Sequence, residues 1–348
     1  MNQPKKLIEV AMPIKEISAE SVRDKSIRHG HISTLHLWWA RRPLPVCRAV
    51  VFASLVPDPM DPNCPQVFKD SVELLLGKAN NPGDPYKPYD DIPYTAVIDP
   101  MEDNGRNRLM MFIGKFSNDY SINERSRKTT ASAKLISEYS LIKSENKNNE
   151  KIISKARKLI WVAHNSVTCK SLEELIAEFD SHFMKINEAE RDLYNTTDRH
   201  LISVDIEVKE DILQDSIKAF LDKMPKVFDP FAGGGAIPLE AARLGCRSFG
   251  NDINPVAHII QKGSLEYPQR FGKSIKFSKA EFIKRYGEKE FKKIKNEKKL
   301  FTNNEASEVI IPNRLSFDIQ FYSNLIINST RGRSKIGKLV AAYGALNS

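Results

Sequence analysis

The sequence predicts an α/β fold with a parallel sheet, a helical insertion ahead of the sheet and a basic segment after it. Three observations lead to this prediction. A glycine-rich segment separates a strand pattern from a helical pattern, the middle of the chain has helical periodicity, and Lys and Arg concentrate near the C-terminal end. Strand, glycine loop, helix and strand in this order form a βαβ unit, which requires a parallel pair of strands.

Composition narrows the class of protein. The 348 residues are 41% hydrophobic and 9% aromatic, which is enough for a packed core and excludes a wholly disordered chain. Mean hydropathy is −0.41, and no apolar run reaches the roughly 18 residues of a membrane span. The first residues lack the apolar stretch of a secretory signal, and the four cysteines form no CxxC pair. We expect a cytoplasmic protein with free thiols, no metal site and no membrane partner.

The chain divides by composition into four segments: an N-terminal domain at residues 1–70, a connector and helical insertion at 71–205, the βαβ unit at 206–272 and a basic tail at 273–348. Proline density at residues 57–100 predicts an extended connector over the surface.

The insertion is expected to support the fold without taking part in chemistry. Helical spacing predicts helices at residues 134–141, 152–163, 172–183 and 186–194. The polar stretch Ser144–Lys151 between the first two predicts a solvated loop.

The βαβ region has the sharpest pattern. Apolar spacing and the positions of Pro225 and Gly245 predict, in order, a helix at Ile212–Met224, a strand at Lys226–Phe231, a helix at Ala236–Leu244, a strand at Arg247–Asp252 and a helix from Pro255 to Leu265.

The loop Asp229-Pro-Phe-Ala-Gly-Gly-Gly235 is typical of a cofactor site. Glycines let the chain turn sharply from strand to helix and let a ligand approach the backbone. Asp252 ends the next strand, so its carboxylate is expected beside the loop, where it can accept both hydroxyls of a ribose. A dinucleotide site requires a third glycine or alanine where Pro238 stands. S-adenosylmethionine (AdoMet) fits better, because it carries no pyrophosphate and its ammonium group suits Asp229. An ordinary glycine turn without a ligand is the remaining alternative.

Three segments carry a family resemblance. DPFAGGGAIPLEAARLG, from Asp229, resembles motif I of the amino-methylating DNA methyltransferases, and FGNDINPVA, from Phe249, resembles the acidic motif that follows it. SIRHGHISTLHLWWARRP, from Ser26, is similar to the head of a large family of bacterial and archaeal adenine-specific DNA methylases. Members of this family begin with a domain of unknown function, and some bear a zinc ribbon. The resemblance covers residues 7–60 and 222–272.

The resemblance implies a Rossmann-like, AdoMet-dependent methyltransferase fold, with either a complete or an incomplete sheet. The activity it implies is methylation of adenine N6 in DNA, in a modification or phage-defence setting. The resemblance further implies that Asp252 binds the ribose of AdoMet and that Ile253 lies near its adenine. The methionine half would be lined by Asp229, Phe231, Gly233 and Gly235.

The N-terminal block resembles motif X of such methylases, a turn that leads into a helix packed beside motif I. Arg41 or Arg42 would then neutralise the AdoMet carboxylate or a DNA phosphate, and the alternative is a pair of exposed surface charges. The three histidines at 29, 31 and 36 complete no familiar metal spacing. Trp38 and Trp39 are either core residues or a platform for an extruded base.

The basic segment Lys273–Lys299 holds eleven Lys and Arg against four Glu. Interleaved aromatic residues predict one helix with an aromatic stripe and a basic face. Lys292 and Lys293 on that face would contact the DNA backbone. The alternative is a solvated, partly frayed helix.

One expected motif is missing. Amino-methyltransferases orient the target amine with Asp/Asn/Ser-Pro-Pro-aromatic, and this tetrapeptide is absent from the sequence. The nearest match, Asp91–Tyr94, has Ile92 in place of the first proline and precedes motif I. We therefore expect an AdoMet-dependent adenine-N6 DNA methylase, or a truncated or split form of one. The first alternative is a non-catalytic DNA-binding or complex-forming subunit that retains the AdoMet fold and awaits a second polypeptide with the missing motif. The second alternative is an unrelated nucleotide-binding enzyme.

Overall fold

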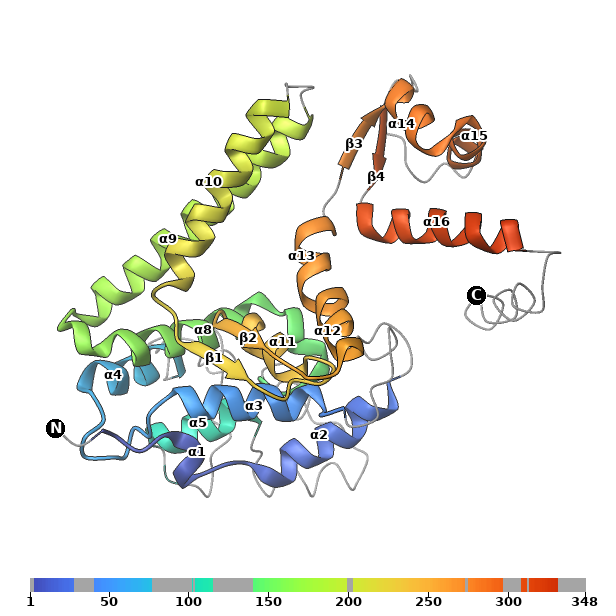
Figure 1. Ribbon diagram of the computed structural model, residues 1–348. Helices are drawn as coiled ribbons and strands as arrows, with labels where there is room; N and C mark the ends of the chain where they lie inside the picture. Colours follow the sequence, from blue (N-terminus) through green and yellow to red (C-terminus); the bar gives the residue numbers. More distant parts are fainter. Residues whose placement is uncertain are drawn as a thin grey trace, which may run out of the picture. The chain divides into compact units, whose positions relative to one another are not determined.

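The computed structural model is mostly helical with small sheets (Figure 1). It describes residues 3–27, 41–76, 102, 104–114, 140–198, 203–272, 275–296, 308–311 and 313–330. The chain forms two compact units. The first comprises Met1–Asp192 and Val208–Gln261, and the second comprises Leu193–Glu207 and Lys262–Ser348.

The first unit is built from helices around one parallel pair of strands. Its helices, including the two long ones that extend beyond it, are α1 (Leu7–Val10), α2 (Ile14–Ser26), α3 (Leu44–Leu55), α4 (Gln66–Leu76), α5 (Gly105–Ile113), the short 3₁₀ helices η2 (Ser144–Asn148) and η3 (Ser166–Thr168), α8 (Glu150–Asn165), α9 (Leu172–Asp198), α10 (Ser203–Leu221), α11 (Ala236–Arg243) and α12 (Pro255–Gln261). Its strands are β1 (Lys226–Asp229) and β2 (Arg247–Gly250).

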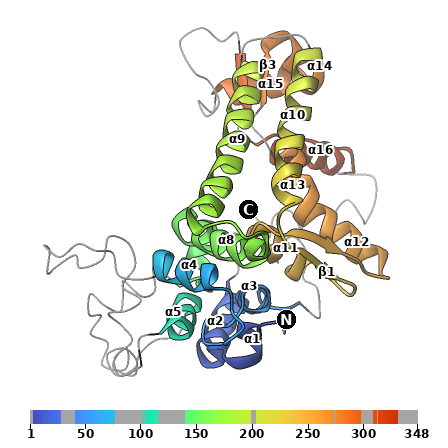
Figure 2. The same ribbon diagram turned by 90° about the vertical axis from the view of Figure 1, so that its left-hand side faces the viewer.

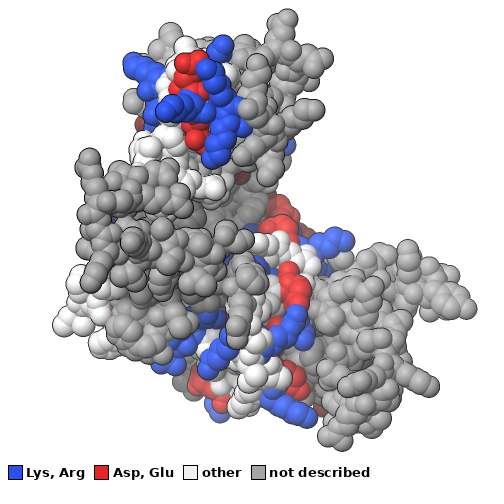
Figure 3. Space-filling view, turned by 90° about the vertical axis from the view of Figure 1, so that its right-hand side faces the viewer, with Lys and Arg blue, Asp and Glu red and all other residues white. Residues whose placement is uncertain are grey.

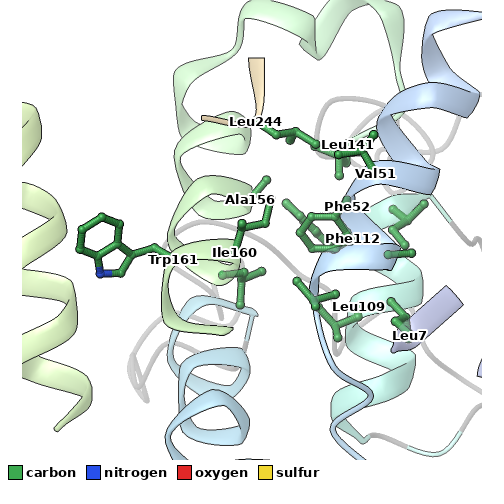
Figure 4. Packing of buried hydrophobic residues seen from close by; sticks show 14 of the residues in the cluster. Leu7, Val51, Phe52, Leu109, Phe112, Leu141, Ala156, Ile160, Trp161 and Leu244 are labelled. Atoms are coloured by element: carbon green, nitrogen blue, oxygen red, sulfur yellow. The ribbon is translucent and has the colours of Figure 1, made fainter. Parts of the chain in front are cut away.

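The core of this unit lies between α3, α5 and α8 (Figure 4). Phe52 of α3 meets Phe112 of α5 edge to face, with ring centroids 5.5 Å apart. Ile160 of α8 points toward these rings, and Leu244, just after α11, belongs to the same cluster. Helices from the two ends of the unit therefore share one core, so neither end is a separate hydrophobic domain.

The opposite side of α8 packs on the long helices α9 and α10, which lie side by side (Figure 2). Trp161 stacks on Phe220 of α10 at 5.7 Å and meets Phe179 of α9 edge to face. The predicted helix at residues 152–163 is thus confirmed as α8. The two helices predicted at 172–183 and 186–194 are one continuous helix, α9.

Two loop predictions are wrong. The expected extended connector at residues 57–100 contains α4, because Phe68, Val72 and Leu76 recur at four-residue spacing and are buried. Proline density masked that period. The expected solvated loop at Ser144–Lys151 contains η2, in which the side chain of Asn146 is buried and donates a hydrogen bond to the Ser140 carbonyl at 2.8 Å. Residues 77–101 and most of the helix predicted at 134–141 lie outside the described residues.

The parallel βαβ unit is confirmed. β1 pairs with β2 in register from Lys226 opposite Arg247 to Asp229 opposite Gly250, and α11 connects the two strands. The helix predicted at Pro255–Leu265 begins as α12 and continues after Gln261 as a π-helical turn, Lys262–Glu266. Among the described residues, the parallel sheet consists of this one pair.

The second unit has an aromatic core of its own. It contains α13 (Tyr267–Phe271), β3 (Ile275–Ser278), α14 (Lys279–Tyr286), α15 (Glu288–Asn296), β4 (Glu308–Ile311) and α16 (Arg314–Thr330), and β3 pairs antiparallel with β4. The single helix predicted at Lys273–Lys299 is wrong, because a strand precedes two helices that Gly287, at φ +88°, separates. The predicted aromatic stripe forms the core instead: Phe277, Phe282, Tyr286 and Phe291.

Candidate cofactor-binding site

The glycine loop turns the chain from the end of β1 into α11. Gly233 and Gly235 have φ values of +52° and +81°, in the left-handed region where side chains other than glycine are strained. The Ala232 N–H donates to the Asn251 carbonyl at 2.9 Å, which ties the loop to the end of β2. The backbone conformation alone therefore favours glycine at both positions.

The Asp252 carboxylate faces this bend. Its Oδ2 accepts a hydrogen bond from the Gly233 N–H at 2.8 Å, and its Oδ1 accepts one from the Asn254 N–H at 2.9 Å. This is the position beside the loop that the sequence predicts. Each carboxylate oxygen has a further lone pair, so Asp252 retains acceptor capacity toward a ligand.

Gln261 of α12 holds the loop from the other side. Its Nε2 donates to the Gly233 carbonyl at 3.0 Å, and the residue is buried. No motif in the sequence identifies this residue. It lies nine positions after Asp252, and its contact with the loop arises only when α12 packs against the loop.

Two large apolar side chains next to Asp229 and Asp252 in the sequence are exposed to solvent. Phe231 is 85% exposed and Ile253 is 98% exposed. The Phe231 N–H donates to Asp229 Oδ1 at 3.0 Å, so a carboxylate at the end of β1 fixes the start of the loop. Two carboxylates at the ends of adjacent parallel strands, a bend that needs glycine and exposed apolar side chains therefore lie where open α/β sheets bind their ligands.

Helix α3, which follows the predicted motif X turn, lies against the helix after the glycine loop. α3 packs on α11, which confirms that these segments are adjacent in space although a long insertion separates them in sequence. Arg48 of α3 and Glu240 of α11 form a buried ion pair, with Nε 2.5 Å from Oε2. The Arg48 Nη1 also donates to the Leu141 carbonyl at 2.8 Å. Sequence reasoning missed this pair, because Arg48 lies in an otherwise apolar helix and its partner is 192 residues away.

The two predicted N-terminal arginines differ in environment. The Arg41 guanidinium is partly buried and pairs with the fully buried side chain of Asp24 at 2.8 Å, so part of its donor capacity serves the fold. Arg42 is exposed. The histidines at 29, 31 and 36, together with Trp38 and Trp39, lie outside the described residues.

The predicted DNA contacts, Lys292 and Lys293, are exposed on α15. Their ammonium groups lie 3.1 and 3.3 Å from the carboxylates of Glu288 and Glu290. Figure 3 shows Lys and Arg side chains around a group of acidic side chains on this unit. The surface is therefore mixed rather than uniformly basic.

The residues that the structure describes hold no cluster of His, Cys, Asp and Glu suited to a metal ion. None of their helices combines the length and the apolar character of a membrane span.

Two family profiles match the chain. Residues 11–74 match a family of proteins of unknown function, DUF1156, and residues 209–346 match the D12 class of N6 adenine-specific DNA methyltransferases. The chain carries a DUF1156 domain and a D12-class methyltransferase domain. The glycine loop and Asp252 fall in the D12-class domain, and α3 falls in the DUF1156 domain. No curated protein and no solved structure matches the chain significantly.

Proposed function

We propose that this protein binds AdoMet in a Rossmann-like methyltransferase domain and takes part in N6 methylation of adenine in DNA, within a modification or phage-defence system. The observation that carries the proposal is the Asp252 carboxylate turned onto the glycine bend, 2.8 Å from the Gly233 N–H, in a D12-class domain. Ligands of open α/β sheets bind at the carboxyl ends of the strands, which is where both groups lie.

Each predicted residue has a defined role in this proposal. Asp229 accepts from the ammonium group of AdoMet, and Asp252 accepts from the ribose hydroxyls through its remaining lone pairs. Phe231 and Ile253 cover apolar parts of the cofactor and lose solvent exposure. The glycines at 233 and 235 let the backbone approach it. When bound, AdoMet supplies the electrophilic methyl group.

No residue is assigned to orient the target amine. The sequence lacks the Asp/Asn/Ser-Pro-Pro-aromatic tetrapeptide. Its nearest match, Asp91–Tyr94, lies outside the described residues. In the proposal, this role falls to a polypeptide segment that carries the tetrapeptide.

Calorimetry with AdoMet and with NAD tests the cofactor. We expect AdoMet to bind and NAD not to bind, because the loop has Pro238 where a dinucleotide fingerprint needs a small third residue. Binding of NAD without binding of AdoMet would overturn the proposal.

A second candidate is a complex-forming subunit that retains the cofactor fold. It is favoured by the outer face of the β1–β2 pair, where Phe228 and Phe249 lie opposite each other and are 63% and 44% exposed. Parallel sheets are normally covered on both faces. The partner in this case is a polypeptide that adds strands to the sheet, covers these rings with a helix and carries the tetrapeptide.

Transfer of tritiated methyl groups to unmethylated DNA separates the two candidates. Transfer by the purified chain alone supports the methyltransferase and excludes the need for a partner. AdoMet binding without transfer, followed by transfer after such a polypeptide is added, supports the subunit.

A further inference from the structure

Both hydrogen-bonding groups of the Gly233 backbone are held by side chains from the segment after β2. The N–H donates to Asp252 Oδ2 at 2.8 Å, and the carbonyl accepts from Gln261 Nε2 at 3.0 Å. Gly233 is the first left-handed residue of the bend. Its backbone is therefore clamped from both sides at the point where the chain departs from ordinary geometry.

Gly250, the last residue of β2, makes room for this clamp. A Cβ on Gly250 would lie 2.5 Å from Gln261 Oε1 and 2.9 Å from the ring of Pro238. The φ of Gly250 is not in the left-handed region, so it is the close approach of Gln261, Pro238 and Ala232 that favours glycine there. The amide is thus fitted between the end of β2 and the glycine bend, and it is 7% exposed.

A buried amide in this place has a clear physical effect. A bend that is already held in its bound conformation loses less conformational freedom when a ligand arrives, and the ligand binds more tightly for that reason. Without Gln261, the buried Gly233 carbonyl would lose its partner and the left-handed conformation would lose one of its two restraints.

We propose that Gln261 is a positioning residue that preorganises the glycine bend for AdoMet. This inference rests on the proposed function for the identity of the ligand. Gln261 does not touch the reacting atoms, and its effect on binding passes through the Gly233 carbonyl.

Two variants test the proposal. Gln261→Met keeps the approximate shape of the side chain and removes the donor, and Gln261→Asn keeps the amide but shortens its reach. Ile259→Ala is the matched control, because Ile259 lies on the same helix and is 66% exposed. Calorimetry should give a five- to tenfold loss of AdoMet affinity for both Gln261 variants, on the order expected for one hydrogen bond, with wild-type affinity for the control.

Amide hydrogen exchange gives a readout that does not require the ligand. In both variants we expect faster exchange at Gly233 and Gly235. The Cys246 N–H, which bonds to the Ala241 carbonyl at 2.9 Å outside the loop, should be unchanged. Wild-type exchange at the loop, or wild-type AdoMet affinity, in both folded variants overturns the proposal.

The same readout distinguishes this proposal from the proposed function. If the wild-type protein does not bind AdoMet but the Gln261 variants loosen the loop, the cofactor assignment fails and the clamp stands. If AdoMet binds equally to the wild-type protein and to both variants, the cofactor assignment stands and the positioning role fails.

Discussion

Asp252 has a role in the fold and a second, proposed role in ligand binding. Its two carboxylate oxygens accept backbone hydrogen bonds from Gly233 and Asn254, and the same oxygens are the proposed acceptors for ribose. The proposal therefore couples loop formation to cofactor binding at this residue.

Replacing Asp252 should weaken AdoMet binding. Asp252→Ala removes the ribose acceptors and one restraint on Gly233, so we expect a loss of about 1–3 kcal/mol of binding free energy by calorimetry. Asp222→Ala is the control, since Asp222 pairs with Arg247 elsewhere on the unit. Equal affinities of the Asp252 variant and the wild-type protein would remove the ribose assignment.

Sequence reasoning predicted the loop glycines and Asp252 because their positions along the chain follow from a strand–loop–helix–strand order. It missed Gln261, Arg48 and Glu240. Each of these acts on a partner brought close only by packing, and a glutamine or an arginine in a helix has no local signature of that contact.

At the scale of elements, α3 and α11 are joined by charge inside an apolar core. Arg48 and Glu240 are almost fully buried, and Glu240 is also paired with Arg243. α11 begins directly after Gly235, so a shift of this helix would move the glycine bend.

A double-mutant cycle measures that connection. Glu240→Leu leaves the buried Arg48 without its carboxylate partner and should lower the free energy of unfolding by about 3–5 kcal/mol. Arg48→Met leaves Glu240 paired with Arg243 and should lower the free energy of unfolding by less. The loss of unfolding free energy in the double variant should be much smaller than the sum of the two single losses, because neither Arg48 nor Glu240 is then left without the other. Urea unfolding monitored by circular dichroism gives the four values. Additive losses would show that the two side chains act independently.

The lysines of α15 allow a test of DNA contact. If Lys292 and Lys293 each neutralise one phosphate, changing both to Gln should reduce the salt dependence of DNA affinity, the slope of log K against log salt concentration, by about 2. Lys170→Gln, which removes an exposed lysine paired with Glu178 in the first unit, should leave the slope unchanged. Fluorescence anisotropy across a salt series provides the slopes. An unchanged slope in the α15 variant would show that these two lysines do not contact DNA and belong to a solvated helix face.

At the scale of the whole molecule, local patterns predicted most elements but not their assembly. Helical spacing located α8 and α11, and the glycine loop located the parallel pair. Periodicity within a window of a dozen residues does not indicate that Phe52 and Leu244 share a core, because that depends on packing between distant segments.

The reactivity of the cysteine thiols tests whether the interior of the first unit is packed as described. Burial raises the pKa of the Cys47 and Cys246 thiols to about 12 and that of Cys64 to about 11, so little thiolate is available at pH 8. Cys169 is exposed. Alkylation with iodoacetamide, followed by mass spectrometry, should modify Cys169 in the native protein and the other three only after unfolding. Rapid native modification of Cys47 or Cys246 would contradict the packing of α3 against α11.

The pairing of Arg48 with Glu240 has a consequence for biosynthesis. Arg48 is added to the growing chain 192 residues before its carboxylate partner. Until then the surface of α3 that packs on α11 lacks its partner, although α5 and α8 are already made. The final packing of α3 must wait until translation has passed the glycine loop. A stalled or shortened product would therefore present that surface to chaperones and proteases.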